Sequence, residues 1–326
     1  MYPLLLLRRA RRIFGPATIA QAICFLIALS FPARLSHAQD QAAQINTQQD
    51  LSQRRQDEEL KKRAQFHVTD PELGDINLVS RQQRPKMFSF STNQSFNYTS
   101  NAFLVRNGEQ DTVFYNGRFD ASFVPYATRN FTPRLTFEHN FFRYDEFSEL
   151  DFDSQSLQLD LKYDLNRDDT WFLDGSYTAA RLESPKSRIG EFYTYGLLNA
   201  SVTHIRQLGK SPAFLAATLG SNWRQGDPSA FDRVTAYLNL LVSYSPVETV
   251  QLGAFVRPEG QLYTNDPLRS SRKDFNISAG TNFSWTPIEY VTLSATALFI
   301  GNYSTLGVRE YDVFSPNLTL AAQIAF

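Results

Sequence analysis

Apolar and polar residues alternate with a period of two from residue 87 to the end of the chain. In the first stretch Phe88, Phe90 and Phe96 fall on one face, and serine and asparagine residues fall on the other. Successive side chains of a β-strand point to opposite faces, so this pattern predicts strands. Because the two faces differ so strongly, we expect the strands to separate an apolar environment from a polar one.

The alternation divides into twelve segments separated by turn-forming or polar residues. The segments are 87–99, 111–124, 131–143, 152–165, 170–182, 192–206, 212–224, 232–245, 249–259, 273–286, 289–301 and 312–326. The 240 residues from 87 to 326 give each strand and its connection about 20 residues. That length suits membrane-crossing strands of about ten residues or more.

The connections between these segments alternate in length. Every second one is a short turn, such as 166–168 and 245–248, whereas the others, such as 100–110 and 260–272, are longer and more polar. Outer-membrane barrels combine short periplasmic turns, long outer loops and an even number of strands. The sequence therefore predicts an all-β fold, a transmembrane antiparallel up-and-down β-barrel of about 12 strands with both termini in the periplasm.

Aromatic residues of the apolar face gather near both ends of the segments. Near the short turns they are Phe123, Phe131, Tyr163, Trp171, Tyr244 and Trp285, and near the long connections they are Tyr98, Phe141, Phe192, Phe275 and Phe299. Leucine, valine and alanine predominate between them. Two aromatic girdles around an apolar band are typical of membrane barrels, so we expect this face to contact outer-membrane lipid.

Charged residues fall on the polar face, which would surround the lumen. The expected pore-lining residues are Arg118, Asp120, Arg134, Glu138, Asp160, Lys162, Asp174, Arg233, Arg257, Glu259 and Asp274. A shift of one residue would turn these side chains toward lipid, where an Arg or Lys near the midplane costs about 2–4 kcal/mol. A polar network that only stabilises the barrel is the alternative interpretation.

Hairpin geometry places some of these charges opposite or diagonally across from one another. With turns centred near residues 127–128 and 167, the expected pairs are Arg118 with Glu138, Asp120 with Arg134, and Lys162 with Asp174. Barrels of about eight strands fill with side chains, and those of about sixteen leave an aqueous channel. Twelve strands should therefore leave a narrow, partly obstructed passage.

The first 38 residues have the composition of a signal peptide. Residues 8–12 contain four arginines, an apolar run extends from Ala17 to Phe31, and cleavage is expected after Ala38. A membrane anchor is the alternative, because residues 13–33 carry no charge, but prolines bracket the run. The protein is therefore expected to leave the cytoplasm.

Residues 39–86 differ in composition from everything after them. Residues 39–63 are rich in Gln, Asp, Glu, Lys and Arg, and residues 67–86 contain several turn-forming dipeptides. We interpret residues 39–86 as a polar periplasmic extension, partly helical or disordered. A plug, or a segment that binds a periplasmic partner, is the alternative.

Composition limits the chemistry further. Five of the 32 basic residues and none of the 33 acidic ones lie in the leader, so 27 basic and 33 acidic residues remain, a net charge of −6. This balance does not suit the phosphate backbone of a nucleic acid. The only cysteine, Cys24, lies in the leader, and the chain has four histidines, so no metal or other cofactor is expected. A mean hydropathy of −0.34 excludes a bundle of transmembrane helices.

The top of the first hairpin carries an aromatic, asparagine-containing segment, Phe96-Asn97-Tyr98-Thr99-Ser100-Asn101-Ala102-Phe103-Leu104. It resembles the opening of outer-membrane β-barrel porins of the β-barrel porin 2 type, and the pattern extends over about residues 87–326. Several members of that group are associated with exopolysaccharide export or surface glycans. The resemblance implies a porin-like barrel and names no substrate.

Catalysis and calcium binding are weaker alternatives. Some twelve-stranded outer-membrane barrels are phospholipases with a Ser-His-Asn site at the lipid face, for which His139 and His204 would be the candidate bases. Neither has an outward Ser and Asn at a recognisable spacing. An acidic cluster in the second long connection comprises Glu146, Glu149, Asp151 and Asp153, without the spacing or glycine of a calcium loop. We expect no enzymatic activity.

The chain ends on Phe326 in mid-alternation. This ending is typical of the C-terminal signal by which outer-membrane proteins engage the β-barrel assembly machinery. We expect a narrow pore for small hydrophilic solutes, or for export of a surface polysaccharide. A non-conducting barrel that anchors a periplasmic partner through residues 39–86 is the competing class.

Overall fold

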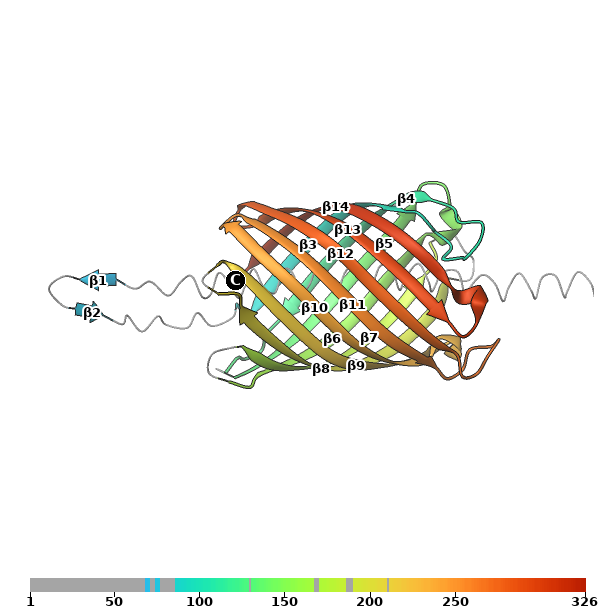
Figure 1. Cartoon of the computed structure of the whole chain (residues 1–326), viewed down its shortest axis with the longest axis horizontal. Helices are drawn as coiled ribbons and strands as arrows, with labels where there is room; N and C mark the ends of the chain where they lie inside the picture. Colours follow the sequence, from blue (N-terminus) through green and yellow to red (C-terminus); the bar gives the residue numbers. More distant parts are fainter. Residues whose placement is uncertain are drawn as a thin grey trace, which may run out of the picture.

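Most of the described part of the chain is one closed antiparallel barrel (Figure 1). The computed structural model describes residues 68–70, 74–76, 86–128, 130–166, 170–185, 190–209 and 211–326. The predicted leader and most of the predicted extension lie outside these residues. The barrel strands are β3 (Phe88–Thr99), β4 (Thr112–Phe123), β5 (Phe131–Tyr144), β6 (Phe152–Asp164), β7 (Trp171–Glu183), β8 (Glu191–Gln207), β9 (Ala213–Asp227), β10 (Arg233–Val247), β11 (Val250–Tyr263), β12 (Lys273–Ile288), β13 (Val291–Ser304) and β14 (Tyr311–Ala325). The short strands β1 (Val68–Asp70) and β2 (Gly74–Ile76) pair with each other in a separate sheet.

Each barrel strand pairs with its neighbours in sequence, and the last strand closes the barrel against the first. β14 pairs with β3 from Asn317 opposite Asn97 to Ala325 opposite Ser89. At the end of this ladder, Phe88 N donates to Phe326 O at 3.0 Å, and Phe326 N donates to Phe88 O at 2.9 Å. Closure leaves no sheet edge with unpaired backbone groups. The predicted all-β, up-and-down barrel of twelve strands is confirmed.

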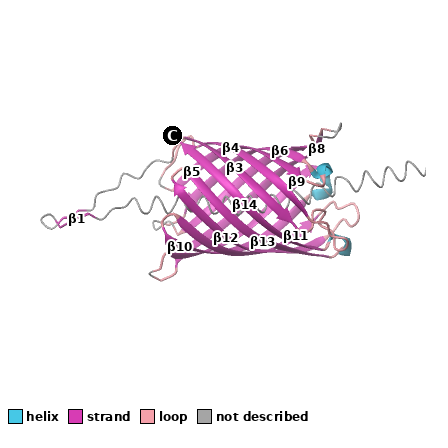
Figure 2. Ribbon diagram, turned by 90° about the horizontal axis from the view of Figure 1, so that it is seen from above, coloured by secondary structure: helices cyan, strands magenta, loops and turns pink. Residues whose placement is uncertain are grey.

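The strands are tilted, as closure of a barrel requires, and the two ends differ (Figure 2). The C-terminus lies at one end, and the 3₁₀ turns lie at the other. These turns are η1 (Ser148–Leu150), η2 (Ser229–Phe231) and η3 (Gly307–Arg309), and each belongs to one of the longer connections. No helix in the described part of the chain is long and apolar enough to cross a membrane.

Observed strand ends differ from the predicted ones by a few residues. β11 continues to Tyr263, beyond the expected end at residue 259, because its last residues pair with the start of β10. Arg233 lies opposite Tyr263, and Thr235 lies opposite Gln261. The hydrogen-bonded ladder between β10 and β11 therefore continues beyond residue 259, where the apolar–polar alternation becomes less regular.

The two faces of the wall differ in polarity as the alternation predicts. On β3 and β14 the outward side chains Phe96 and Leu318 are about 60% exposed, whereas their inward neighbours Asn97 and Thr319 are buried. Inward polar groups bond to one another across strands, as Thr203 Oγ1 and Thr218 Oγ1 do at 2.9 Å. The barrel thus presents apolar side chains outward and encloses polar ones.

Candidate functional site

The inner wall is the candidate site because the charged side chains of the strands gather there. All eleven expected pore-lining residues occupy inward positions in the observed register. Arg118, Asp120, Arg233, Glu259 and Asp274 are buried, and the other six are partly exposed. Pore-lining residues must have this placement.

A three-residue charge cluster lies on β4 and β5. Arg118 Nε is 2.8 Å from Asp120 Oδ1, and Arg118 Nη2 is 2.9 Å from Glu138 Oε2. Ser91 Oγ donates to Asp120 Oδ2 at 3.0 Å, and Asn140 Nδ2 donates to Glu138 Oε1. One planar guanidinium thus bridges two carboxylates, which fixes its orientation. The expected pairing of Arg118 with Glu138 is confirmed.

The expected pairing of Asp120 with Arg134 is wrong, because the hairpin register differs. β4 and β5 pair Phe123 with Leu135, which centres the hairpin near residue 129 and not near 127–128. Asp120 therefore lies opposite Glu138, while Arg134 lies opposite Asp160 on β6. The turn is closed by Thr128 and Phe131, since Thr128 N donates to Phe131 O at 2.9 Å and Phe131 N donates to Thr128 Oγ1 at 3.0 Å.

Other expected charges also have neighbours of opposite sign. Lys162 lies directly opposite Asp174, as expected. Lys162 Nζ is also 3.8 Å from Asp164 Oδ1 and 4.4 Å from the centre of the Phe172 ring. On β11, Arg257 Nε lies 3.1 Å from Glu259 Oε2. The charged wall is therefore cross-linked within and between strands.

Arginines stacked on tyrosines lie along the wall formed by β8 to β11. The Cζ atom of Arg257 is 4.2 Å from the centre of the Tyr237 ring, and that of Arg224 is 4.6 Å from Tyr195. Arg233, which lies opposite Arg224, donates through Nη1 to Tyr263 Oη at 3.1 Å. Arg224 and the three tyrosines were not among the expected pore-lining residues, although their inward phase along the strands was an available signal.

The loop between β3 and β4, residues 100–111, folds into the barrel. Although this connection is one of the longer, more polar ones, Asn101, Ala102, Phe103 and Leu104 in its first half are all buried. Phe103 belongs to an apolar cluster with inward residues of β4 to β8. Leu104 belongs to a second cluster with Leu241, Phe255, Leu298, Ile300 and Val313 of β10, β11, β13 and β14. The loop therefore contacts both halves of the wall and obstructs the lumen near its long-connection end.

Local hydrogen bonds hold this loop in its inward course. Asn101 Nδ2 donates to Val105 O at 2.7 Å, and Val105 N donates back to Asn101 Oδ1 at 3.1 Å. Leu104, at the tip, has a positive φ of 50°, which is uncommon for a residue other than glycine. At the loop's exposed side, Arg106 Nη1 lies 2.7 Å from Glu310 Oε2. The sequence signal for this loop was the apolar run 102–105 inside a polar connection.

A second charge cluster lies at the same end of the barrel. Arg272 pairs with Asp266 and, through Nε at 3.1 Å, with Asp274 Oδ2. Its guanidinium lies over the Tyr263 ring, with Cζ 3.4 Å from the ring centre. Burial, followed by the charge of Arg272, lowers the pKa of Arg309 in η3. Cations and carboxylates are thus closely packed at the end of the barrel that carries the long connections.

The candidate residues for catalysis and calcium binding occupy ordinary structural environments. His139 points outward, with Phe119 and Gln155 opposite it on the two neighbouring strands. His204 stacks on Trp171 with ring centres 4.2 Å apart. Asp151 Oδ1 accepts a bond from Tyr144 N at 2.8 Å, and Asp153 pairs with Arg143 at 2.6 Å. Among the described residues, no group of three or more His, Cys, Asp or Glu is placed to hold a metal ion.

Comparison with known proteins identifies the fold. No family model and no curated protein matches the sequence. An outer membrane channel from Pseudomonas putida F1 is similar in structure, with a TM-score of 0.52 and 13% identity over 74% of this chain and 96% of that one. The translocator domain of autotransporter NalP from Neisseria meningitidis gives 0.44 and 12% over 86% and 97%, and the NanC porin gives 0.44 and 8% over 72% and 100%. The chain therefore has the fold of an outer-membrane β-barrel.

Proposed function

We propose that this protein is an outer-membrane barrel that forms a narrow pore for small hydrophilic solutes. The observation that carries the proposal is the polar, charged inner wall enclosed by an apolar outer surface. A barrel with an outward apolar band belongs in a bilayer, and its polar interior can replace water around a solute. Both signs of charge occur along the wall, so we expect weak selectivity between small anions and cations.

The proposed orientation follows from the lengths of the connections. The short connections and both ends of the barrel domain would face the periplasm, and the long connections, with the 100–111 loop, would face outward. Residues 39–86 would then extend into the periplasm, where they could contact a partner. Assembly would proceed through the β-barrel assembly machinery.

Export of a surface polysaccharide is the alternative within the same class. It is supported by the resemblance of residues 96–104 to porins associated with glycans. The second half of that segment is the part of the loop that enters the lumen. A polymer could pass only if this loop moved aside, so a small solute suits the observed shape better.

Planar-bilayer conductance separates the pore from a non-conducting anchor. We expect the mature chain and a chain lacking residues 39–86 both to give discrete channel openings. Silence of both, with the barrel shown to be folded by its heat-dependent gel mobility, would support an anchor. Openings only after truncation would assign residues 39–86 as a plug.

A further inference from the structure

Two charge clusters face each other across the middle of the lumen. The Arg118–Asp120–Glu138 cluster is on β4 and β5, and the Arg257–Glu259 pair is on β11. β5 and β11 are six strands apart in either direction around the closed barrel, so they lie on opposite sides of the lumen. Arg118 is the seventh of the 12 residues of β4, and Arg257 is the eighth of the 14 residues of β11. Both clusters therefore lie near the mid-height of the wall.

Contacts from three strands hold the Arg257 guanidinium in place. Its Cζ atom is 4.2 Å from the centre of the Tyr237 ring on β10, and its Nε is 3.1 Å from Glu259 Oε2. The Tyr237 hydroxyl in turn donates to Asn199 Oδ1 on β8 at 3.0 Å. A Cβ atom on Gly220 of β9 would come within 2.5 Å of this hydroxyl, so the tyrosine ring crosses β9 where that strand has no side chain. The guanidinium is therefore fixed at one place on the lumen wall.

The carboxylate of Glu259 is also held by hydrogen bonds along β11. Gln261 Nε2 donates to Glu259 Oε1, and Tyr263 Oη donates to Gln261 Oε1 at 2.9 Å. The side chains of Arg257 and Glu259 are only 12% and 6% exposed. Salt and water screen charges less when these are held away from bulk solvent. An ion that passes the middle of the lumen should therefore interact strongly with both charges.

We propose that Arg257 and Glu259 together determine the charge selectivity of the pore. Their opposite charges nearly cancel, which gives the weak selectivity expected of the wild type. Loss of one charge alone leaves the other uncompensated in the lumen, where it repels ions of its own sign and favours those of the opposite sign. Charge selectivity requires a conducting barrel, so this role rests on the proposed function.

Reversal potentials in a KCl gradient across planar bilayers test the proposal, because they give the permeability ratio of K⁺ to Cl⁻. Arg257→Gln should raise this ratio about threefold, since Glu259 is left without its counter-charge. Glu259→Gln should lower it by a similar factor. The double variant Arg257→Gln/Glu259→Gln should return to the wild-type ratio, because both charges are removed. Heat-dependent gel mobility shows that each variant is folded.

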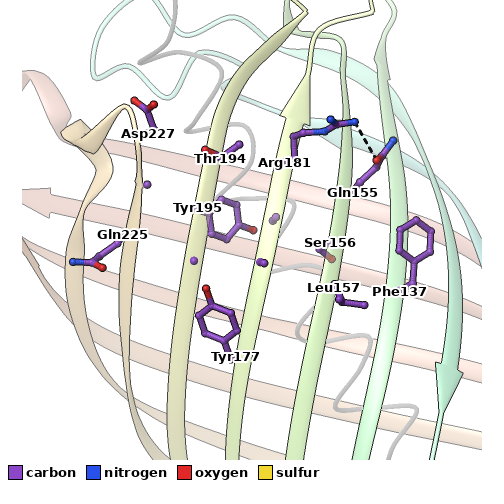
Figure 3. A pocket seen from close by; sticks show the side chains of 14 residues that line it. Phe137, Gln155, Ser156, Leu157, Tyr177, Arg181, Thr194, Tyr195, Gln225 and Asp227 are labelled. Carbon is purple, nitrogen blue, oxygen red and sulfur yellow. Dashed lines mark hydrogen bonds between the residues drawn. The ribbon is translucent and has the colours of Figure 1, made fainter.

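An outward pair with the same spacing on β7 is the matched control. Arg181 Nη2 lies 2.6 Å from Glu183 Oε1 and donates to Gln155 Oε1 at 3.4 Å (Figure 3). Arg181 points outward, because its neighbours Ala180 and Leu182 are the buried, inward residues of this part of β7. Arg181→Gln and Glu183→Gln change the net charge by the same amounts as the lumen variants. Because these charges lie outside the lumen, both control variants should keep the wild-type ratio.

A thiol introduced beside the pair allows charge to be added after the barrel has folded. Ser278 lies opposite Arg257 on β12, and the only cysteine of the chain, Cys24, lies in the predicted leader. An anionic methanethiosulfonate reagent on Ser278→Cys should raise the ratio, and a cationic one should lower it.

Two results would overturn the proposal and leave the pore intact. One is open channels whose ratio is unchanged in both Arg257→Gln and Glu259→Gln. The other is a thiol in Ser278→Cys that reacts only after denaturation, which would place the pair outside the conducting path. Silence of the wild type would instead contradict the proposed function itself.

Discussion

At the scale of single residues, Arg118 is the centre of the charged wall. Its side chain is 7% exposed and contacts two carboxylates on adjacent strands. A charge held this far from water is stabilised chiefly by its partners, and removing one partner leaves the other uncompensated. Removing Arg118 or Glu138 alone should therefore lower the free energy of unfolding by more than the intact ion pair raises it.

We expect Arg118→Ala to destabilise the barrel by about 3 kcal/mol, because Asp120 and Glu138 then repel each other without a counter-charge. The double variant Arg118→Ala/Glu138→Ala should be milder than the sum of its single changes, by about 1 kcal/mol or more. The measurement is urea unfolding in detergent, followed by tryptophan fluorescence.

Lys162→Ala combined with Glu138→Ala is the control pair. Lys162 faces Thr132 and Asp174 on its two neighbouring strands, several residues from Glu138 along β5. Changes at separated sites add, so this pair should show no coupling. Strict additivity for Arg118 with Glu138 would contradict the role assigned to their contact.

At the scale of elements, the 100–111 loop is held mainly by apolar burial. Phe103 and Leu104 are buried, and each such side chain contributes about 1.5–3 kcal/mol. The Arg106–Glu310 pair has exposed fractions of 64% and 29%, and exposed pairs contribute about 0.2–1 kcal/mol. Contact of Leu104 with the far wall, and not the ion pair, should therefore keep the loop inside.

Leu104→Ala should raise single-channel conductance and increase opening noise, since it removes the contact with the Leu241–Phe255 side of the lumen. Glu310→Gln should leave conductance close to that of the wild type. Both are measured in planar bilayers at the same ionic strength. A larger effect of Glu310→Gln would mean that the ion pair, and not the leucine, holds the loop.

At the scale of the whole molecule, the two ends of the barrel sequence meet. Phe326 lies outward beside Phe88 and Phe90, with ring centres 6.2 and 6.0 Å away, and its backbone bonds to Phe88. In a bilayer each unpaired backbone group costs several kcal/mol, so the β14–β3 seam has to be complete. The final residue is part of that seam as well as the expected assembly signal.

Deletion of Phe326, or Phe326→Asp, should sharply lower the heat-modifiable fraction in the outer membrane while export to the periplasm continues. Phe326→Tyr keeps the aromatic ring and should assemble normally. Cell fractionation and gel mobility with and without heating measure both effects. Undiminished assembly of the deletion and of Phe326→Asp would argue against an assembly role for this residue.

The sequence by itself determined the strands, their number and their two faces. Period-two alternation is a local property, because each inward residue is flanked by outward ones whatever the neighbouring strand is. Phe88 and Ser89 therefore point to opposite sides in the structure, as expected. The pairing of Lys162 with Asp174 was also predictable, since β6 ends at Asp164 and β7 begins at Trp171, on the two sides of the turn-forming residues.

Only the tertiary structure decided the course of residues 100–111 and the β4–β5 register. Leu104 is buried by Phe255 and Leu298, which lie more than 140 residues away in the chain, so no local pattern reports that contact. The β4–β5 register depends on which residues close the turn, here Thr128 and Phe131, and alternation alone does not specify that pair. Alternation determines which side of the wall a residue faces. Closure of the barrel determines which residues its side chain contacts, because closure brings together residues from distant parts of the chain.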